Sequence, residues 1–79
     1  MSELKTLLEE IARSIVDDAD SVSVVQQGDD DTNFTLTLSV AQSDMGRVIG
    51  RGGRIAHSIR VVMKAAAIAH RVRVNVEIR

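Results

Sequence analysis

The first eighteen residues carry apolar side chains at helical spacing. Leucine or isoleucine recurs every three or four residues, at Leu4, Leu7, Leu8, Ile11 and Ile15. This pattern predicts a surface helix with one buried stripe. Ser2 is the predicted N-cap of this helix. We expect the helix to end near Asp18, because carboxylates at a helix C-terminus oppose its dipole.

Two later stretches have the pattern of a β-hairpin. Residues 21–27 are rich in valine, and residues 34–40 alternate between apolar and hydroxyl side chains. Alternation of this kind predicts strands with one buried face. Residues 28–33 (GDDDTN) lie between them and have the composition of a loop. We expect Phe34, the only aromatic residue, to pack in the core rather than to stack on a base.

The rest of the chain predicts two helices and a last strand. Ser43 or Asp44 is expected to cap a short helix that runs through Ile49. Three glycines in residues 50–53 then interrupt it, because glycine is unfavourable in a helix interior. A second helix is predicted for residues 53–69, with a buried side formed by Ile55, Ile59, Val62, Met63 and Ala66. Residues 71–79 alternate apolar and polar side chains and predict a strand.

The order α-β-β-α-α-β predicts an α+β fold. Two helices separate the second strand from the third, so these strands can pair in parallel through a right-handed crossover. We therefore expect a three-stranded mixed sheet packed against three helices. A chain of 79 residues can build only one hydrophobic core, so residues 1–79 are predicted to form a single domain of modest stability.

Composition narrows the classes of function. The contents of hydrophobic residues (44%) and charged residues (27%) are those of a folded, soluble domain. The absence of cysteine excludes disulfides and thiolate metal sites. The N-terminal residues lack the long apolar run of a signal peptide, and no membrane segment is expected. A cytoplasmic location follows as the expectation.

The net charge of −1 hides a strong asymmetry along the chain. Residues 1–40 hold two basic and nine acidic residues, a net charge of −7, whereas residues 41–79 hold eight basic and two acidic residues, a net charge of +6. Such asymmetry favours an anionic partner for the second half. A dipolar surface that serves only solubility would give the same counts, so charge alone leaves both readings open.

Residues 47–55 (RVIGRGGRI) combine a glycine loop with three arginines. Glycine lets the main chain approach an anion closely, amides at the start of the next helix point outward, and arginine adds forked hydrogen bonds. A tight corner between two helices would also require glycines. The spacing matches neither a Walker-type phosphate loop nor a dinucleotide-binding fingerprint.

The longer string of residues 48–59 (VIGRGGRIAHSI) resembles the core of a KH domain, in which a GXXG loop clamps a single-stranded nucleic-acid backbone. The element order resembles the type II KH topology. Residues 44–50 (DMGRVIG) resemble the corresponding stretch of the small bacterial single-KH RNA-binding proteins of the KhpA (YlqC) family. The resemblance extends over essentially the whole chain.

This resemblance implies a non-catalytic, single-stranded RNA-binding protein, such as a post-transcriptional regulator or RNA chaperone. The implied RNA-binding residues are Arg47, Val48, Ile49, Gly50, Arg51, Gly52, Gly53, Arg54 and Ile55. The opposite wall of the cleft is expected from strand 34–40 and the loop before it, whose residues Asp29, Asp30 and Asp31 would repel phosphates if they leaned over the cleft. Weak binding with loose sequence preference is expected from one KH unit with one aromatic residue.

An alternative function is protein interaction, with the chain acting as a homodimer or as the partner of a larger KH protein of the KhpB (Jag) type. The resemblance implies both activities.

His57 and His70 lack the neighbours of a metal site, and Asp29–Asp31 lacks the spacing of a calcium loop. No set of nucleophile, base and orienting group is evident, so neither an enzyme nor a cofactor is expected.

Overall fold

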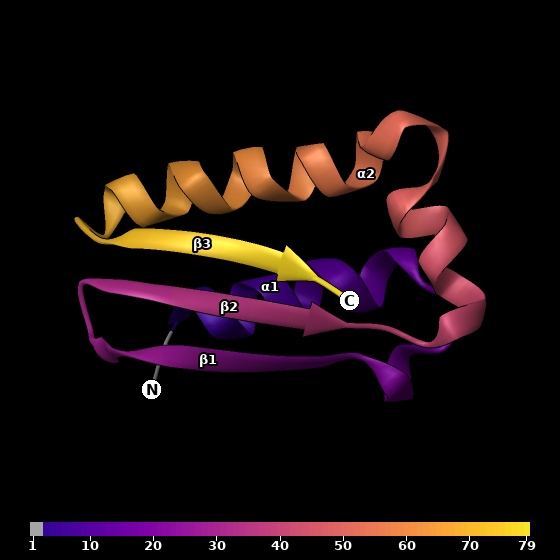
Figure 1. The fold of residues 1–79 in the computed structure, drawn as a ribbon, viewed down its shortest axis with the longest axis horizontal. Helices are drawn as coiled ribbons and strands as arrows, with labels where there is room; N and C mark the ends of the chain where they lie inside the picture. The colour runs from indigo at the N-terminus through magenta and orange to yellow at the C-terminus, as the bar shows by residue number, and fades with distance from the viewer. Residues whose placement is uncertain (1–2) are drawn as a thin grey trace.

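The computed structural model describes residues 3–79, with the side chains of Asp29 and Arg51 excepted. These described residues form two helices, one short 3-10 turn and three strands (Figure 1). In chain order they are α1 (Glu3–Ile15), η1 (Ala19–Ser21), β1 (Ser23–Asp30), β2 (Asn33–Ser39), α2 (Gln42–Ala69) and β3 (Arg73–Ile78).

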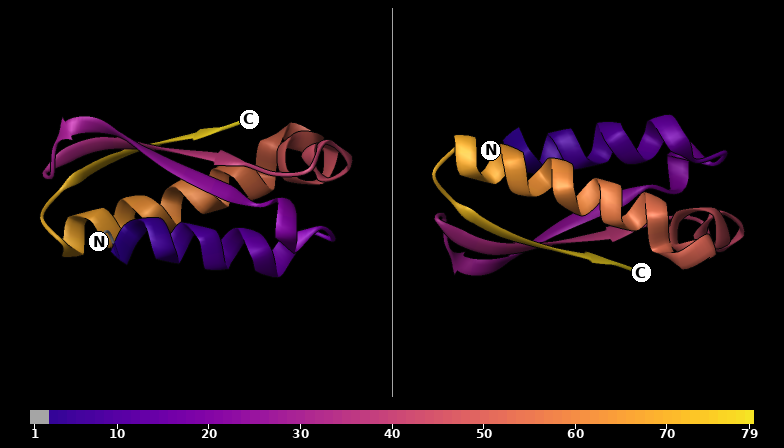
Figure 2. Two further views of the ribbon diagram at one scale, coloured as in Figure 1. Left: turned by 90° about the horizontal axis from the view of Figure 1, so that it is seen from below. Right: turned by 90° about the horizontal axis from the view of Figure 1, so that it is seen from above.

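The three strands form one mixed sheet in the order β1-β2-β3. β1 and β2 pair antiparallel, whereas β2 and β3 pair in parallel, with Leu36 opposite Val76. This arrangement confirms the predicted crossover between the second and third strands. Figure 2 shows α1 and the C-terminal part of α2 side by side on the same face of the sheet. No helix of the described part of the chain covers the other face of the sheet.

The core lies between these helices and the sheet. Leu8 of α1, Leu36 and Leu38 of β2, and Met63 of α2 are almost fully buried. Phe34 is also buried, which confirms its expected packing role. The prediction that Val62 is buried is wrong, since 46% of it is exposed. The buried side of α2 is centred on Met63, and the preceding residue is rotated by about 100° around the helix axis.

The glycines divide α2 into two arms, as predicted. The helix α2 extends from Gln42 to Ala69, but Gly52 and Gly53 within it have positive φ angles of 73° and 70°. Right-handed helical backbone requires negative φ, so the chain turns sharply there (Figure 1). We call residues 42–51 the first arm and residues 54–69 the second arm.

Several predicted boundaries shift. α1 ends at Ile15 rather than near Asp18, and its predicted N-cap, Ser2, lies outside the described residues. The N-cap of α2 is Ala41 rather than Ser43 or Asp44, because the Asp44 carboxylate is used elsewhere. β1 continues to Asp30, so part of the expected loop is strand. Within residues 3–79, no helix is both long and apolar enough to cross a membrane.

Candidate nucleic-acid interface

The bend of α2 encloses a small hollow between its two arms. Gly46, Arg47 and Gly50 from the first arm and Arg54 and Ile55 from the second arm line about 310 Å³ of space. The two glycines keep the first arm's surface free of side chains, since a Cβ added at either would meet no atom within 4 Å. The bend therefore combines exposed main chain, an apolar side and two guanidinium groups.

The structure assigns different positions to the three predicted apolar residues of this site. Val48 is fully buried and belongs to the core, so it supports the first arm from behind. Ile49 is 45% exposed, and Ile55 is half-buried on the hollow itself. Of the predicted arginines, Arg54 is exposed, whereas the side chain of Arg51 lies outside the described part of the chain.

Arg47 is engaged with the segment that follows α1. Its two terminal nitrogens donate to the two carboxylate oxygens of Asp17, at 3.0 and 3.2 Å. One of them also donates to the carbonyl oxygen of Ile15 at 3.4 Å. The side chains of Arg47 and Asp17 are 50% and 78% exposed, so this ion pair lies at the surface. Sequence spacing gave no sign of the pair, because its members are thirty residues apart.

A buried carboxylate fixes the same segment. Asp44, in the first turn of α2, is only 2% exposed. Its two oxygens accept hydrogen bonds from the backbone N–H groups of Asp17 and Asp18, both at 3.1 Å. A buried carboxylate without such donors would be costly, so these bonds account for its burial. Asp44 therefore joins the start of α2 to the chain just beyond α1.

A longer groove runs between the second arm of α2 and β3, with a volume of about 430 Å³. Arg60, Lys64 and Arg73 line it together with apolar residues of β3 such as Val74 and Val76. The Arg60 side chain spans the groove, because its Nε donates to the carbonyl oxygen of Val76 at 3.4 Å. The spacing of Arg60 and Lys64 by four residues could have identified them from sequence.

This groove is bordered by β3 and not by strand 34–40, the strand expected to form the opposite wall of the RNA cleft. β2 is the central strand, and its alternate residues Phe34, Leu36 and Leu38 are buried beneath the helices. The strand that faces the second arm across the groove is β3. Sequence alternation identified strand 34–40 but not its central place in the sheet.

The acidic turn between β1 and β2 lies at the other end of the molecule from the bend (Figure 1). It therefore does not lean over the bend, although Asp30 and Arg73 line a shared hollow at the far end of the groove. Within the turn, the carboxylate of Asp30 accepts hydrogen bonds from the backbone N–H and the hydroxyl of Thr32, at 2.8 and 2.7 Å. These bonds lower the pKa of Asp30 below its usual value.

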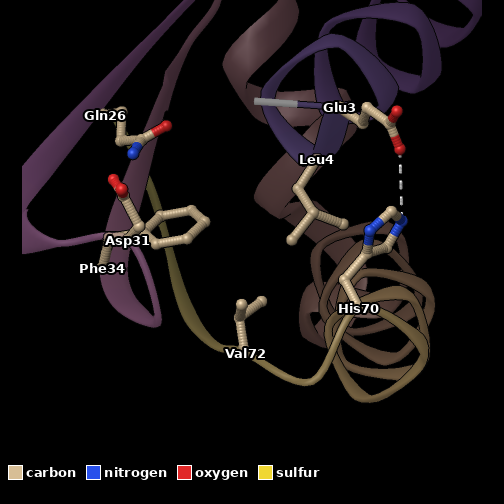
Figure 3. Close-up of a pocket in the computed structure, with 7 residues that line it drawn as sticks. All are labelled: Glu3, Leu4, Gln26, Asp31, Phe34, His70 and Val72. Atoms are coloured by element: carbon tan, nitrogen blue, oxygen red, sulfur yellow. Dashed lines mark ion pairs between the residues drawn. The ribbon is translucent and has the colours of Figure 1, made fainter. Parts of the chain in front are cut away.

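A second hollow of about 550 Å³ lies near this turn (Figure 3). Leu4, Phe34 and Val72 form its apolar part, and Glu3 makes an ion pair with His70 at 3.6 Å between Oε2 and Nε2. His70 is thus engaged with a single carboxylate. Among the residues that the structure describes, no group of three or more histidine, aspartate or glutamate side chains could hold a metal ion.

Comparisons with known proteins agree with one another. The family model described as "KhpA/KhpB, KH domain" matches residues 5–78. A protein of Clostridium acetobutylicum named RNA-binding protein KhpA is 51% identical over 75 residues, which cover 95% of this chain and 99% of that protein. Proteins of the same name from Clostridium perfringens and Halalkalibacterium halodurans are 47% and 44% identical, again over 95% of this chain and over 99% and 97% of theirs. No solved structure gave a significant match.

Proposed function

Because the chain belongs to the KhpA/KhpB KH-domain family, we propose that it binds single-stranded RNA at the bend of α2. Membership confirms the family resemblance and the KH fold class predicted from the sequence. The relatives are named for RNA binding and not for a reaction, which agrees with the prediction of a non-catalytic protein. A role in post-transcriptional regulation or as an RNA chaperone is part of this proposal.

The hollow at the bend carries the proposal, because it has what a sugar-phosphate backbone requires. Gly50 and Gly52 leave the main chain open to close approach, with nothing near their Cβ positions. The second arm begins at this point, so its first amides and its dipole favour an anion. Arg54 is exposed beside the hollow, and Arg51 lies within the same loop. Guanidinium groups bind phosphate through paired hydrogen bonds.

The groove between α2 and β3 supplies a path for the rest of the strand. Lys64 lies eleven residues after Gly53, about 16 Å along the helix axis at about 1.5 Å per residue. Arg60, Lys64 and Arg73 place positive charge along this length, and the half-buried Val74 offers apolar surface to unpaired bases. A KH domain clamps about four nucleotides, which is a length that this path can hold. The proposed site thus extends beyond the glycine loop to three cations on the groove.

Salt dependence of binding tests this proposal. The logarithm of the affinity for single-stranded RNA should fall with the logarithm of salt concentration at a slope of about −0.7 per phosphate contacted, or roughly −1.4 to −2.1 for two or three contacts. Arg54→Ala should reduce that slope by up to about 0.7 for every RNA sequence, because backbone contacts carry no base information. Duplex RNA should bind more weakly, since its bases are paired.

Arg13→Ala is the matched control for Arg54→Ala. Arg13 is an exposed arginine on α1 that pairs with Glu9 and lines neither the hollow nor the groove. Its removal should leave the salt slope unchanged. Equal losses in the two variants, or a flat salt response of the unmodified protein, would show that RNA does not bind at the bend.

A second candidate function is protein interaction, and the outer face of the second arm favours it. Val61, Val62 and Ile68 are 53%, 46% and 68% exposed. Ser58, Val61, Ala65 and Ile68 follow one another at intervals of three and four residues, the spacing of a seam between two packed helices. We propose that this face pairs with a second copy of the chain. A larger KH protein of the KhpB (Jag) type is the alternative occupant.

Concentration dependence of stability tests self-association. If two copies pair through this face, the melting temperature should rise with protein concentration. Val61→Glu should abolish that rise and give a monomer in light scattering, because it places a charge in the seam. Val25→Glu is the matched control, since Val25 is 52% exposed on β1, away from α2. A monomeric mass and a concentration-independent melt of the unmodified protein would contradict self-association.

A further inference from the structure

The ion pair between Arg47 and Asp17 occupies the donors that a phosphate would use. Arg47 lines the hollow at the bend, next to Gly50 and Arg54. Its two terminal nitrogens bind the two oxygens of Asp17, at 3.0 and 3.2 Å. Carboxylate and phosphate accept the same forked pair of hydrogen bonds from arginine. Asp17 therefore holds Arg47 in the manner in which an RNA phosphate would hold it.

The position of Asp17 is built into the fold. The buried carboxylate of Asp44 accepts hydrogen bonds from the backbone N–H groups of Asp17 and Asp18. Arg47 follows Asp44 by three residues, so both side chains leave the first arm on the same side. Asp44 thus fixes the backbone of Asp17, and Arg47, three residues further along the helix, binds the Asp17 carboxylate. This arrangement distinguishes the pair from a chance contact between two mobile side chains.

Arg54 provides a contrast on the opposite side of the hollow. No ion pair or hydrogen bond of its guanidinium is formed with the residues that the structure describes. A ligand can therefore engage Arg54 directly. To engage Arg47 in the same forked manner, it must first displace a carboxylate.

We propose that Asp17 sets the affinity of the RNA site by competing with an RNA phosphate for Arg47. This inference rests on the proposed RNA-binding function of the bend. Both partners of the pair are at least half exposed, and exposed ion pairs are weak, so a phosphate can replace Asp17 without unfolding any element. When a phosphate takes the place of Asp17 on Arg47, the freed Asp17 carboxylate attracts a cation from solution. Binding therefore releases fewer counterions than the number of phosphate contacts would indicate.

The proposal predicts tighter binding when the carboxylate is removed. Asp17→Asn should raise the affinity for single-stranded RNA by about two- to fivefold, the range set by the strength of an exposed ion pair. It should also steepen the salt slope by up to about 0.7, because one more cation is released. Asp17→Ser removes the same carboxylate with a shorter side chain and should behave alike. Circular dichroism of each variant establishes that it is folded.

Asp18→Asn is the matched control, because it makes the same change in net charge one residue away. Its side chain contacts Ser21 and not Arg47. The gain from Asp17→Asn should exceed the gain from Asp18→Asn, and the excess should vanish when both are measured in an Arg47→Ala background. Equal gains in the two variants, an excess that persists without Arg47, or weaker binding by Asp17→Asn would each overturn the proposal.

Arg54→Ala separates failure of this inference from failure of the proposed function. If Arg54→Ala weakens RNA binding but Asp17→Asn and Asp18→Asn behave alike, the bend binds RNA and Asp17 does not compete for Arg47. If Arg54→Ala has no effect, the RNA site itself is misplaced, and the inference falls with it.

Discussion

Two glycines of the loop should respond in opposite ways to the same substitution. A Cβ added at Gly50 or at Gly52 would meet no atom within 4 Å, so neither change to alanine creates a clash. The two positions differ in backbone conformation. Gly52 has a φ of 73°, whereas Gly50 lies in the first arm of α2 without a positive φ. Any difference between the two variants therefore reports backbone conformation rather than packing.

The sizes of the two effects follow from that difference. Alanine in the left-handed region costs about 1–2 kcal/mol, so Gly52→Ala should destabilise the protein by that amount. Alanine in place of a helical glycine reduces the freedom of the unfolded chain, so Gly50→Ala should stabilise it by about 0.4–1 kcal/mol. For a domain of this size about 1 kcal/mol corresponds to about 4–8 °C. The two melting temperatures should differ by at least about 6 °C, with the unmodified protein between them.

RNA binding by Gly50→Ala connects this pair to function. The new methyl group would project into the hollow that we assign to the RNA backbone. Affinity should fall by about two- to tenfold, the equivalent of one net hydrogen bond, although the fold becomes more stable. Thermal melts followed by circular dichroism and fluorescence anisotropy with labelled RNA measure both quantities. Shifts of both melting temperatures in the same direction, or unchanged affinity of Gly50→Ala, would refute the reasoning.

Three further predictions concern stability. Asp44→Asn should lower the free energy of unfolding by about 1.5–3 kcal/mol, because it loses one charged hydrogen bond to a backbone amide. Its control is Asp20→Asn on the exposed turn, which should change the free energy of unfolding by less than about 0.5 kcal/mol when both variants are measured by thermal melts. Leu36→Ala should lower the free energy of unfolding measured by urea titration by about 2–5 kcal/mol, because this side chain is fully buried in the central strand. A smaller loss would mean that the core closes around the cavity. Thr32→Val should raise the pKa of Asp30 in an NMR titration, because a hydroxyl bond that favours its charged form is lost. A carboxyl group whose pKa is lowered by folding stabilises the protein at pH values above its unfolded pKa, and this stability is lost as the pH falls through the folded pKa. The stability difference caused by Thr32→Val should therefore disappear at pH values well below the unfolded pKa of about 3.9. A difference that grows there would contradict this sign.

Periodicity predicts the fold well where a segment buries one face. The alternation of residues 34–40 and the helical stripe of α1 both agree with the observed burial of Leu4, Leu8, Leu36 and Leu38. The same reasoning failed at Val62, because α2 carries apolar residues on both its inner and outer faces. Periodicity alone could not tell which face meets the sheet. The caps and ends of helices were also misplaced, since they depend on contacts such as that of Asp44 with the chain beyond α1.

The candidate site was predictable to the extent that it is local in sequence. The glycine loop and its arginines are adjacent in the chain, so the sequence pattern and the family resemblance could propose them as the site. The contributions of Asp17, Arg60 and Arg73 depend on which distant elements the fold brings together, and no local pattern encodes them. The contacts between distant elements also determine which cations of residues 41–79, whose net charge is +6, remain available to a ligand. Arg47 and Arg79 form ion pairs with carboxylates, whereas Arg60, Lys64 and Arg73 of the groove form none with the residues that the structure describes. The three cations of this groove lie beside the glycine loop, and this placement supports our proposal of an anionic strand as the partner over a dipolar surface that serves only solubility.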